Sequence, residues 1–265
     1  MELLGSAIMQ YMVSVIWPFL RISSMIGAMF ILGSRMLPIR IRLVFCIVIT
    51  WAVIPLIPPV ESGIELFSLE GAIVTINQII IGTTLGFVTE FIAQCFILAG
   101  QVVAMQTGLG FASIMDPVNG ASTPVVGQFF SMLCALVFFG IDGHLVFIDL
   151  IHKSFTTLPV GLNFIAPSSW ETLSLFLSVM FQVAVNFSIA SICTMLIINF
   201  ALGVMTRAAP QLNIFSMGFA VSMILGIGVL WLTLGGFMGY FEKLFDHVTE
   251  MMCTVMNYQC TGSVR

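Results

Sequence analysis

Histidine and glycine are the residues whose types and spacing could support catalysis or phosphate binding in this chain. His144, His152 and His247 are too far apart in the sequence to form a recognisable metal-ligand set. The glycine-rich stretch 108–111 precedes no Lys-Ser/Thr pair, so it does not have the pattern of a phosphate-binding loop. No hydrolase, metalloprotease or dinucleotide-binding motif occurs elsewhere. These patterns predict a protein that is not an enzyme and has no cofactor or metal.

The cysteines have no metal-binding pattern either. Four of them lie in separate apolar runs without a C-x-x-C pair, and we expect them to be free and buried: Cys46, Cys95, Cys134 and Cys193. Cys253 and Cys260 lie in the tail and could pair only in an oxidising compartment.

A charged residue inside an apolar run marks a functional or packing site, because burying its charge is costly. Arg21 is such a residue, three positions after Pro18, where we expect a helix kink. The interpretation we favour is that Arg21 pairs with an acidic side chain on a neighbouring helix.

A second polar feature is a stripe along one predicted helix. Its members are separated by seven, four, seven and seven positions, which places them on one face: Thr83, Glu90, Gln94, Gln101 and Gly108. The stripe either lines an aqueous path or forms hydrogen bonds with adjoining helices. A proton relay through Glu90 is the least favoured option, since no second carboxylate or histidine shares the stripe.

The elements that position these residues are apolar helices. Of the 265 residues, 59% are hydrophobic and 8% are charged, whereas soluble domains carry about 25% charged residues. A net charge of −4 argues against a nucleic-acid partner. The composition therefore predicts an all-α, polytopic membrane protein whose surface is covered by lipid or by other apolar helices.

About six apolar runs are present, some of them long enough for kinked or broken helices. They cover residues 7–32, 43–57, 69–115, 124–151, 170–205 and 214–240. Gly82-x-x-x-Gly86 and Gly235-x-x-x-Gly239 predict close approach between helices. Residues 241–258 have the spacing of an amphipathic helix that lies on a membrane or docks on a partner. We expect a single domain over residues 1–265, with a cytoplasmic first connection because it contains three arginines.

Two segments carry a resemblance to a known family. The stretch from Arg207 through Pro210, Asn213 and Phe215 to Gly218 resembles the signature of the FliR family of flagellar export-gate proteins. The stretch from Gly108 to Asp116-Pro117 resembles the central loop of that family. The similarity extends over nearly the whole chain, and the related subunit of virulence type III secretion systems shares the architecture.

The resemblance implies a subunit of a flagellar type III export gate in the bacterial inner membrane, at the flagellar basal body. Implied partners are FliP-like and FliQ-like subunits, FlhB-like and FlhA-like components, exported flagellar proteins in transit, and membrane lipid. It further implies a gate that is partly raised out of the bilayer. The alternative is a small-solute secondary transporter, since broken helices also form such transport sites.

We further hypothesise that the segment from Met105 to Gly120 projects into the pore and helps to close it. Gly108 and Gly110 would give the backbone conformational freedom, and Phe111 and Met115 would provide bulky apolar side chains. Asp116-Pro117 would form a turn. The competing interpretation is that the segment is a buried structural turn.

The signature segment suggests roles in assembly. Arg207 is a candidate for an ion pair with Asp116 or Glu90, and Asn213 a candidate N-cap of the sixth helix.

Overall fold

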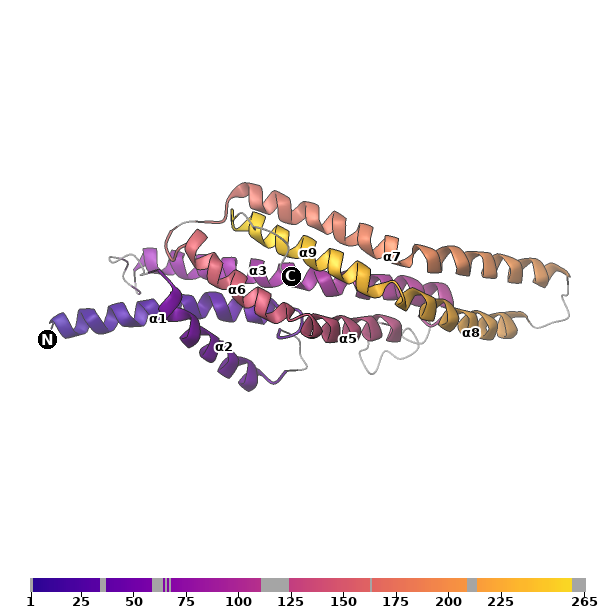
Figure 1. Cartoon of the computed structure of the whole chain (residues 1–265), viewed down its shortest axis with the longest axis horizontal. Coiled ribbons are helices and arrows are strands. Elements are labelled where there is room, and N and C mark those ends of the chain that lie inside the picture. Colours follow the sequence, from indigo (N-terminus) through magenta and orange to yellow (C-terminus); the bar gives the residue numbers. More distant parts are fainter. Residues whose placement is uncertain are drawn as a thin grey trace. The chain divides into compact units, whose positions relative to one another are not determined.

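The structure is a computed structural model that describes residues 2–33, 37–58, 64, 66, 68–110, 124–162, 164–208 and 214–258. Within these ranges every regular element is helical and no strand occurs, which confirms the predicted all-α class (Figure 1). In chain order the elements are α1 (Glu2–Ala28), α2 (Ile39–Val53), the 3₁₀ turn η1 (Ile54–Leu56), α3 (Leu69–Thr107), α5 (Val125–Gly140), α6 (Gly143–Thr157), α7 (Pro167–Ala208), α8 (Ile214–Leu234) and α9 (Phe237–Val255).

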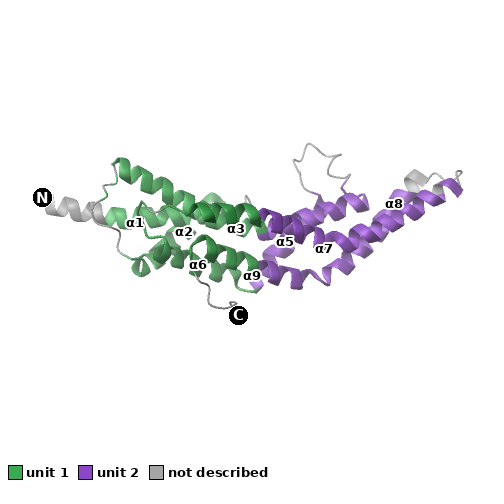
Figure 2. Cartoon of the chain, turned by 90° about the horizontal axis from the view of Figure 1, so that it is seen from above, with its two compact units in different colours: residues 1–91, 141–176, 246–265 green, residues 92–140, 177–245 purple. Residues whose placement is uncertain are grey.

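The chain forms two compact units, which are coloured separately in Figure 2. One contains Met1–Phe91, Ile141–Phe176 and Asp246–Arg265, and the other contains Ile92–Gly140 and Leu177–Phe245. The expectation of a single domain remains a prediction.

The helices have the length and apolar character of membrane spans. In the described ranges four helices could cross a membrane, or up to six if each of two bent pairs counts as one span. The run predicted at 69–115 is one helix of 39 residues that ends at Thr107. α1 runs through Pro18 as one helical element.

Two predicted runs are broken at short turns. The run predicted at 124–151 is divided into α5 and α6 by a turn in which Asp142 takes a left-handed conformation with φ 56°. α8 and α9 meet at a bend of 54° near Gly235 and Gly236, so the last helix begins before the predicted position 241. The sequence Gly-Ile-Asp-Gly at 140–143 is typical of a turn, but the apolar residues on both sides of it made the run look continuous.

In the first unit α1 packs closely against α3. A Cβ atom at Gly82 would overlap the Arg21 carbonyl, and one at Gly86 would lie 2.7 Å from the Ala28 Cβ. The predicted close approach at this glycine pair is confirmed. At Gly239, by contrast, a Cβ would meet nothing within 4 Å in the described part of the chain, so the second pair is not such a contact.

In the second unit phenylalanine rings form the core. The Phe96 ring centroid lies 5.4 Å from Phe187 and 4.6 Å from Phe237, and Phe130 lies 5.4 Å from Phe187. Phe241 continues this cluster 6.1 Å from Phe96. Offset and edge-to-face ring pairs of this kind add about 0.5–1.5 kcal/mol each beyond their buried area.

The predicted amphipathic tail helix is present as α9. The apolar side chains predicted for one face are buried within the chain: Phe241, Leu244, Phe245, Val248, Met251, Met252 and Val255. The acidic side chains Glu242, Asp246 and Glu250 are exposed. The apolar face of α9 therefore packs on this chain itself, and neither a membrane surface nor a partner is needed to cover it.

The cysteines largely follow the prediction. Cys46, Cys95 and Cys134 are free and buried, whereas Cys193 is free but exposed on α7. Cys253 is disulfide-bonded, and Cys260 lies outside the described residues.

Candidate functional site

The polar stripe of α3 lies on a face that the chain leaves partly open. Thr83 is exposed, and Glu90, Gln94 and Gln101 are half-buried. Phe87 and Met105, which lie on the same face, are 50% and 62% exposed. The opposite side of α3 is buried over its whole length, from Val74 to Val103. The stripe is thus available to a conduit or to helices of another chain, and both interpretations stay open.

The stripe ends at a glycine C-cap. Gly108 has φ 80°, and its N–H donates to the Met105 carbonyl at 3.4 Å. The N–H of Gly110 donates to the Ala104 carbonyl at 2.9 Å. A left-handed glycine directly after the last helical residue is a common helix terminus, because a side chain is strained there. This conformation explains why Gly108 stands where α3 ends.

Two contacts with α8 hold this end of α3. A Cβ on Gly108 would lie 2.9 Å from the Phe219 ring, and a Cβ on Gly226 would lie 2.6 Å from the Thr107 Cβ. Thr107 is fully buried. These two α8 residues were not identified in the sequence, since nothing local to Phe219 or Gly226 indicates which helix each one meets.

The remainder of the hypothesised plug lies outside the described residues. Phe111, Met115, Asp116 and Pro117 are in the range 111–123, and the description resumes at Pro124, just before α5. Only the base of the loop, with Met105, Gly108 and Gly110, is therefore placed. The structure fixes where the loop leaves α3, and the plug itself stays a prediction.

Arg21 is fully buried, and no acidic side chain is among its partners in the described part of the chain. Its Nε donates to the Gln78 Oε1 at 2.7 Å. Nη1 donates to the Ser154 carbonyl at 2.9 Å, and Nη2 to the Leu158 carbonyl at 2.8 Å. The guanidinium also lies 4.3 Å from the centre of the Phe155 ring. The prediction of a carboxylate partner is wrong: polar and aromatic groups, and the carboxyl end of α6, take its place.

The end of α6 is a suitable partner for a cation. The last carbonyls of a helix lack intrahelical donors, and together they carry a partial negative charge. Ser154 lies in the last turn of α6, and Leu158 is its C-cap. Arg21 thus connects α1, the α3 side chain of Gln78 and the end of α6 through one planar group. The nearby Trp17 Nε1 donates to the Thr75 hydroxyl at 3.1 Å and adds a second α1–α3 contact.

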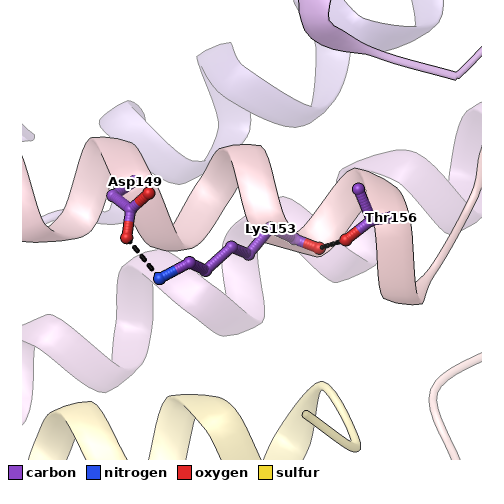
Figure 3. Close-up of polar contacts among 3 residues, drawn as sticks. All are labelled: Asp149, Lys153 and Thr156. Atoms are coloured by element: carbon purple, nitrogen blue, oxygen red, sulfur yellow. Dashed lines mark hydrogen bonds and ion pairs between the residues drawn. The ribbon is translucent and has the colours of Figure 1, made fainter. Parts of the chain in front are cut away.

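The basic residue Lys153 lies on α6, near the helix end that binds Arg21, and its environment differs from that of Arg21. Lys153 forms an ion pair with Asp149, one turn away on α6, at 2.6 Å, and the Thr156 hydroxyl donates to the Lys153 carbonyl at 2.7 Å (Figure 3). The two ionic side chains are 34% and 54% exposed. Exposed pairs of this kind contribute about 0–1 kcal/mol, so this one is not a structural anchor.

The signature segment is described only at its two ends. Arg207 is exposed in the last turn of α7, where a positive charge favours the helix dipole. Pro210 and Asn213 lie outside the described residues; Phe215 and Gly218 belong to α8, which begins at Ile214. The pairing of Arg207 with Asp116 or Glu90, and the cap by Asn213, remain predictions.

The described residues contain no group of three or more His, Cys, Asp or Glu side chains that could hold a metal ion. What the geometry offers is a helix face with amides and one carboxylate, ending in an anchored glycine. Such a face can hydrogen-bond a polar backbone or a neighbouring helix.

Comparisons with known proteins agree with this picture. The family model described as "Bacterial export proteins, family 1" matches residues 12–248. The flagellar biosynthetic protein FliR of Escherichia coli (strain K12) is 31% identical over 241 residues, which cover 91% of this chain and 92% of that protein. FliR of Pectobacterium carotovorum is 33% identical over 240 residues, with 91% of each chain covered. FliR of Aquifex aeolicus is 27% identical over 225 residues, 85% of this chain and 86% of that one.

Proposed function

Because the chain belongs to the FliR family of bacterial export proteins, we propose how it works as a subunit of the flagellar type III export gate. The open face of α3 lines part of the pore through which unfolded flagellar proteins pass, and the loop that follows α3 helps to close the pore at rest. The protein is a non-enzymatic component of the bacterial inner membrane at the flagellar basal body.

The observation that carries this proposal is the partial exposure of polar groups along one face of a long apolar helix. Glu90, Gln94 and Gln101 lie along the partly open face of α3, although the apolar side of the same helix is buried. A partly open face with two amides and a carboxylate suits an aqueous conduit that carries an extended polypeptide better than it suits the apolar interior of a bilayer.

The base of the loop supports a closing role. Gly108 meets the Phe219 ring and Thr107 meets Gly226, so the loop begins from a fixed point at the end of the stripe. Phe111 and Met115 follow within eight residues of that point and have the apolar bulk to obstruct a pore. A structural turn would need no such bulky side chains.

Exposed apolar helix faces support a multi-subunit gate. Large apolar side chains remain exposed along α7, among them Phe181, Ile189, Leu196 and Phe200. We propose FliP-like and FliQ-like subunits as the covering partners, with FlhB-like and FlhA-like components nearby. A small-solute transporter would function without such partners, so a stoichiometric hetero-oligomer in detergent extracts distinguishes the two functions.

The closing role is tested by deleting residues 110–115 and measuring ion flux through the assembled gate in vesicles. We expect increased flux with the assembly intact. The control is Phe164→Ala, which truncates an exposed phenylalanine in a different loop and should leave the flux unchanged. Unchanged flux in the deletion variant would exclude the plug.

A further inference from the structure

The exposed side of α7 carries a row of uncharged polar residues, which we call the α7 stripe. Ser178, Gln182 and Asn186 form this stripe; they are spaced one turn apart and are exposed. The opposite side of the helix belongs to the core of the second unit and consists of buried residues: Met180, Ala184, Phe187, Ser191 and Met195. The α7 stripe therefore points away from this chain.

The two amides of the α7 stripe are not satisfied by the chain itself. Each amide offers two N–H donors and one carbonyl acceptor. In the described part of the chain, neither the Gln182 nor the Asn186 side chain forms a hydrogen bond. The hydroxyl groups of the same helix differ, because they bond to its own backbone: Ser188 donates to the Ala184 carbonyl at 2.9 Å, and Thr194 donates to the Ala190 carbonyl at 2.8 Å. The two amides therefore depend on a partner outside this chain.

Water is a poor cover for this side of α7. No Asp, Glu, Lys or Arg occurs in the range 172–206. Large apolar side chains, including Phe181 and Ile189, are exposed beside the stripe. A helix face in water usually carries charged residues, as the exposed side of α9 does with Glu242 and Asp246. An uncharged stripe between apolar side chains has the character of an interface instead.

Lipid is an equally poor cover, because acyl chains offer the amides no hydrogen bonds. Helices that pack together in a membrane protein are often joined by hydrogen bonds between Ser, Thr, Asn and Gln side chains. This chain contains such a contact on α7 itself, where the Ser222 hydroxyl of α8 donates to the Asn199 Oδ1 at 3.3 Å. The residue types of the α7 stripe therefore favour a protein helix as its cover.

The spacing of the α7 stripe indicates how a partner helix lies on it. Ser178 and Asn186 are about 12 Å apart along the helix axis. Residues four positions apart form a ridge on a helix surface, and a second helix can pack along such a ridge. One helix can thus contact all three side chains if it presents polar groups at a similar spacing.

We propose that the α7 stripe binds one helix of another gate subunit, and that this helix presents Ser, Thr, Asn or Gln side chains to Gln182 and Asn186. The inference rests on the proposed gate function and adds to it the chemistry of one partner surface. The hydrogen bonds fix the register of the partner helix, as a buried polar residue does in a coiled coil. The α7 stripe is distinct from the stripe of α3, which contains a carboxylate and is assigned to the conduit.

The interface is tested by replacing both amides with leucine and measuring how much of each other gate subunit stays bound through purification. Gln182→Leu with Asn186→Leu should weaken the retention of one subunit about three- to thirtyfold per amide, the range expected for side-chain hydrogen bonds between membrane helices. Leucine suits a position that faces lipid, so unchanged retention would overturn the proposal. Thr194→Val is the matched control: Thr194 is exposed, but its hydroxyl bonds to its own helix, so no effect is expected.

A second measurement identifies what covers the stripe without removing both amides. Gln182→benzoylphenylalanine introduces a photoreactive group, and the assembled gate is irradiated in the membrane. We expect a covalent product with a helix of another gate subunit, in a peptide that contains Ser, Thr, Asn or Gln. A product with lipid, with a second copy of this chain or with a purely apolar helix, or no product, would overturn the proposal. If the unaltered chain yields no stoichiometric partner, the gate function itself fails, whereas a partner that is not linked to position 182 overturns only this interface.

Discussion

Replacing Arg21 by methionine should destabilise the first unit far more than any exposed basic residue does. Methionine retains most of the apolar volume, so the main effect is the loss of donors. The Leu158 carbonyl and the Gln78 Oε1 lose the Arg21 donors that lie 2.8 Å and 2.7 Å away. The Ser154 carbonyl keeps a second donor, the Leu158 N–H at 2.9 Å.

The magnitude follows from those two acceptors. A buried polar group without a partner costs about 1–3 kcal/mol, and the variant regains part of this because it no longer buries a charge. We expect a net loss of about 3 kcal/mol in the free energy of unfolding. For a chain of this size that corresponds to a fall in Tm of roughly 6–12 °C.

The assay is thermal unfolding of the purified gate in detergent, followed by the loss of intact complex. Lys153→Met is the matched control: it removes a half-buried basic residue of α6, and its partly exposed pair with Asp149 should contribute less than about 1 kcal/mol. Arg21→Lys should not restore stability, because an ammonium group cannot reproduce the planar set of donors. A fall in Tm for Arg21→Met no larger than that for Lys153→Met would refute this reasoning.

Three further predictions concern single side chains. Gly82→Ala should lower the yield of assembled gate, because its Cβ would overlap the Arg21 carbonyl, whereas Gly239→Ala has open space among the described residues and should be neutral or slightly stabilising. Gly108→Ala places a side chain at φ 80° and against the Phe219 ring, so it should cost about 1–2 kcal/mol and increase ion leakage; normal conductance would show that the loop base tolerates displacement. Arg207→Ala should reduce recovery of the complex, and an intact complex with reduced secretion would instead indicate a role in transport.

The helices were largely predictable because their signals are local. Long apolar runs, with glycine and proline between them, indicate where helices lie, and α1, α2, α3, α7 and α8 occur where those runs do. The three- and four-residue spacing of the tail predicted α9 and identified its buried face correctly. The breaks near residues 140 and 235 were missed because the runs stay apolar across them.

By itself, the sequence determined the class of this protein and its family: a chain so poor in charge must have its helices covered by something apolar, and its signature segments are continuous stretches. The tertiary structure decided which distant groups meet. Arg21 bonds to residues 57 and 133 positions away, and the choice of a helix end over a carboxylate could not be predicted from one helix alone. The tertiary structure also decided which side of α3 stays open and which surface covers the apolar face of α9. Helix formation depends mainly on residues within one or two turns, whereas burial depends on every neighbouring helix at once.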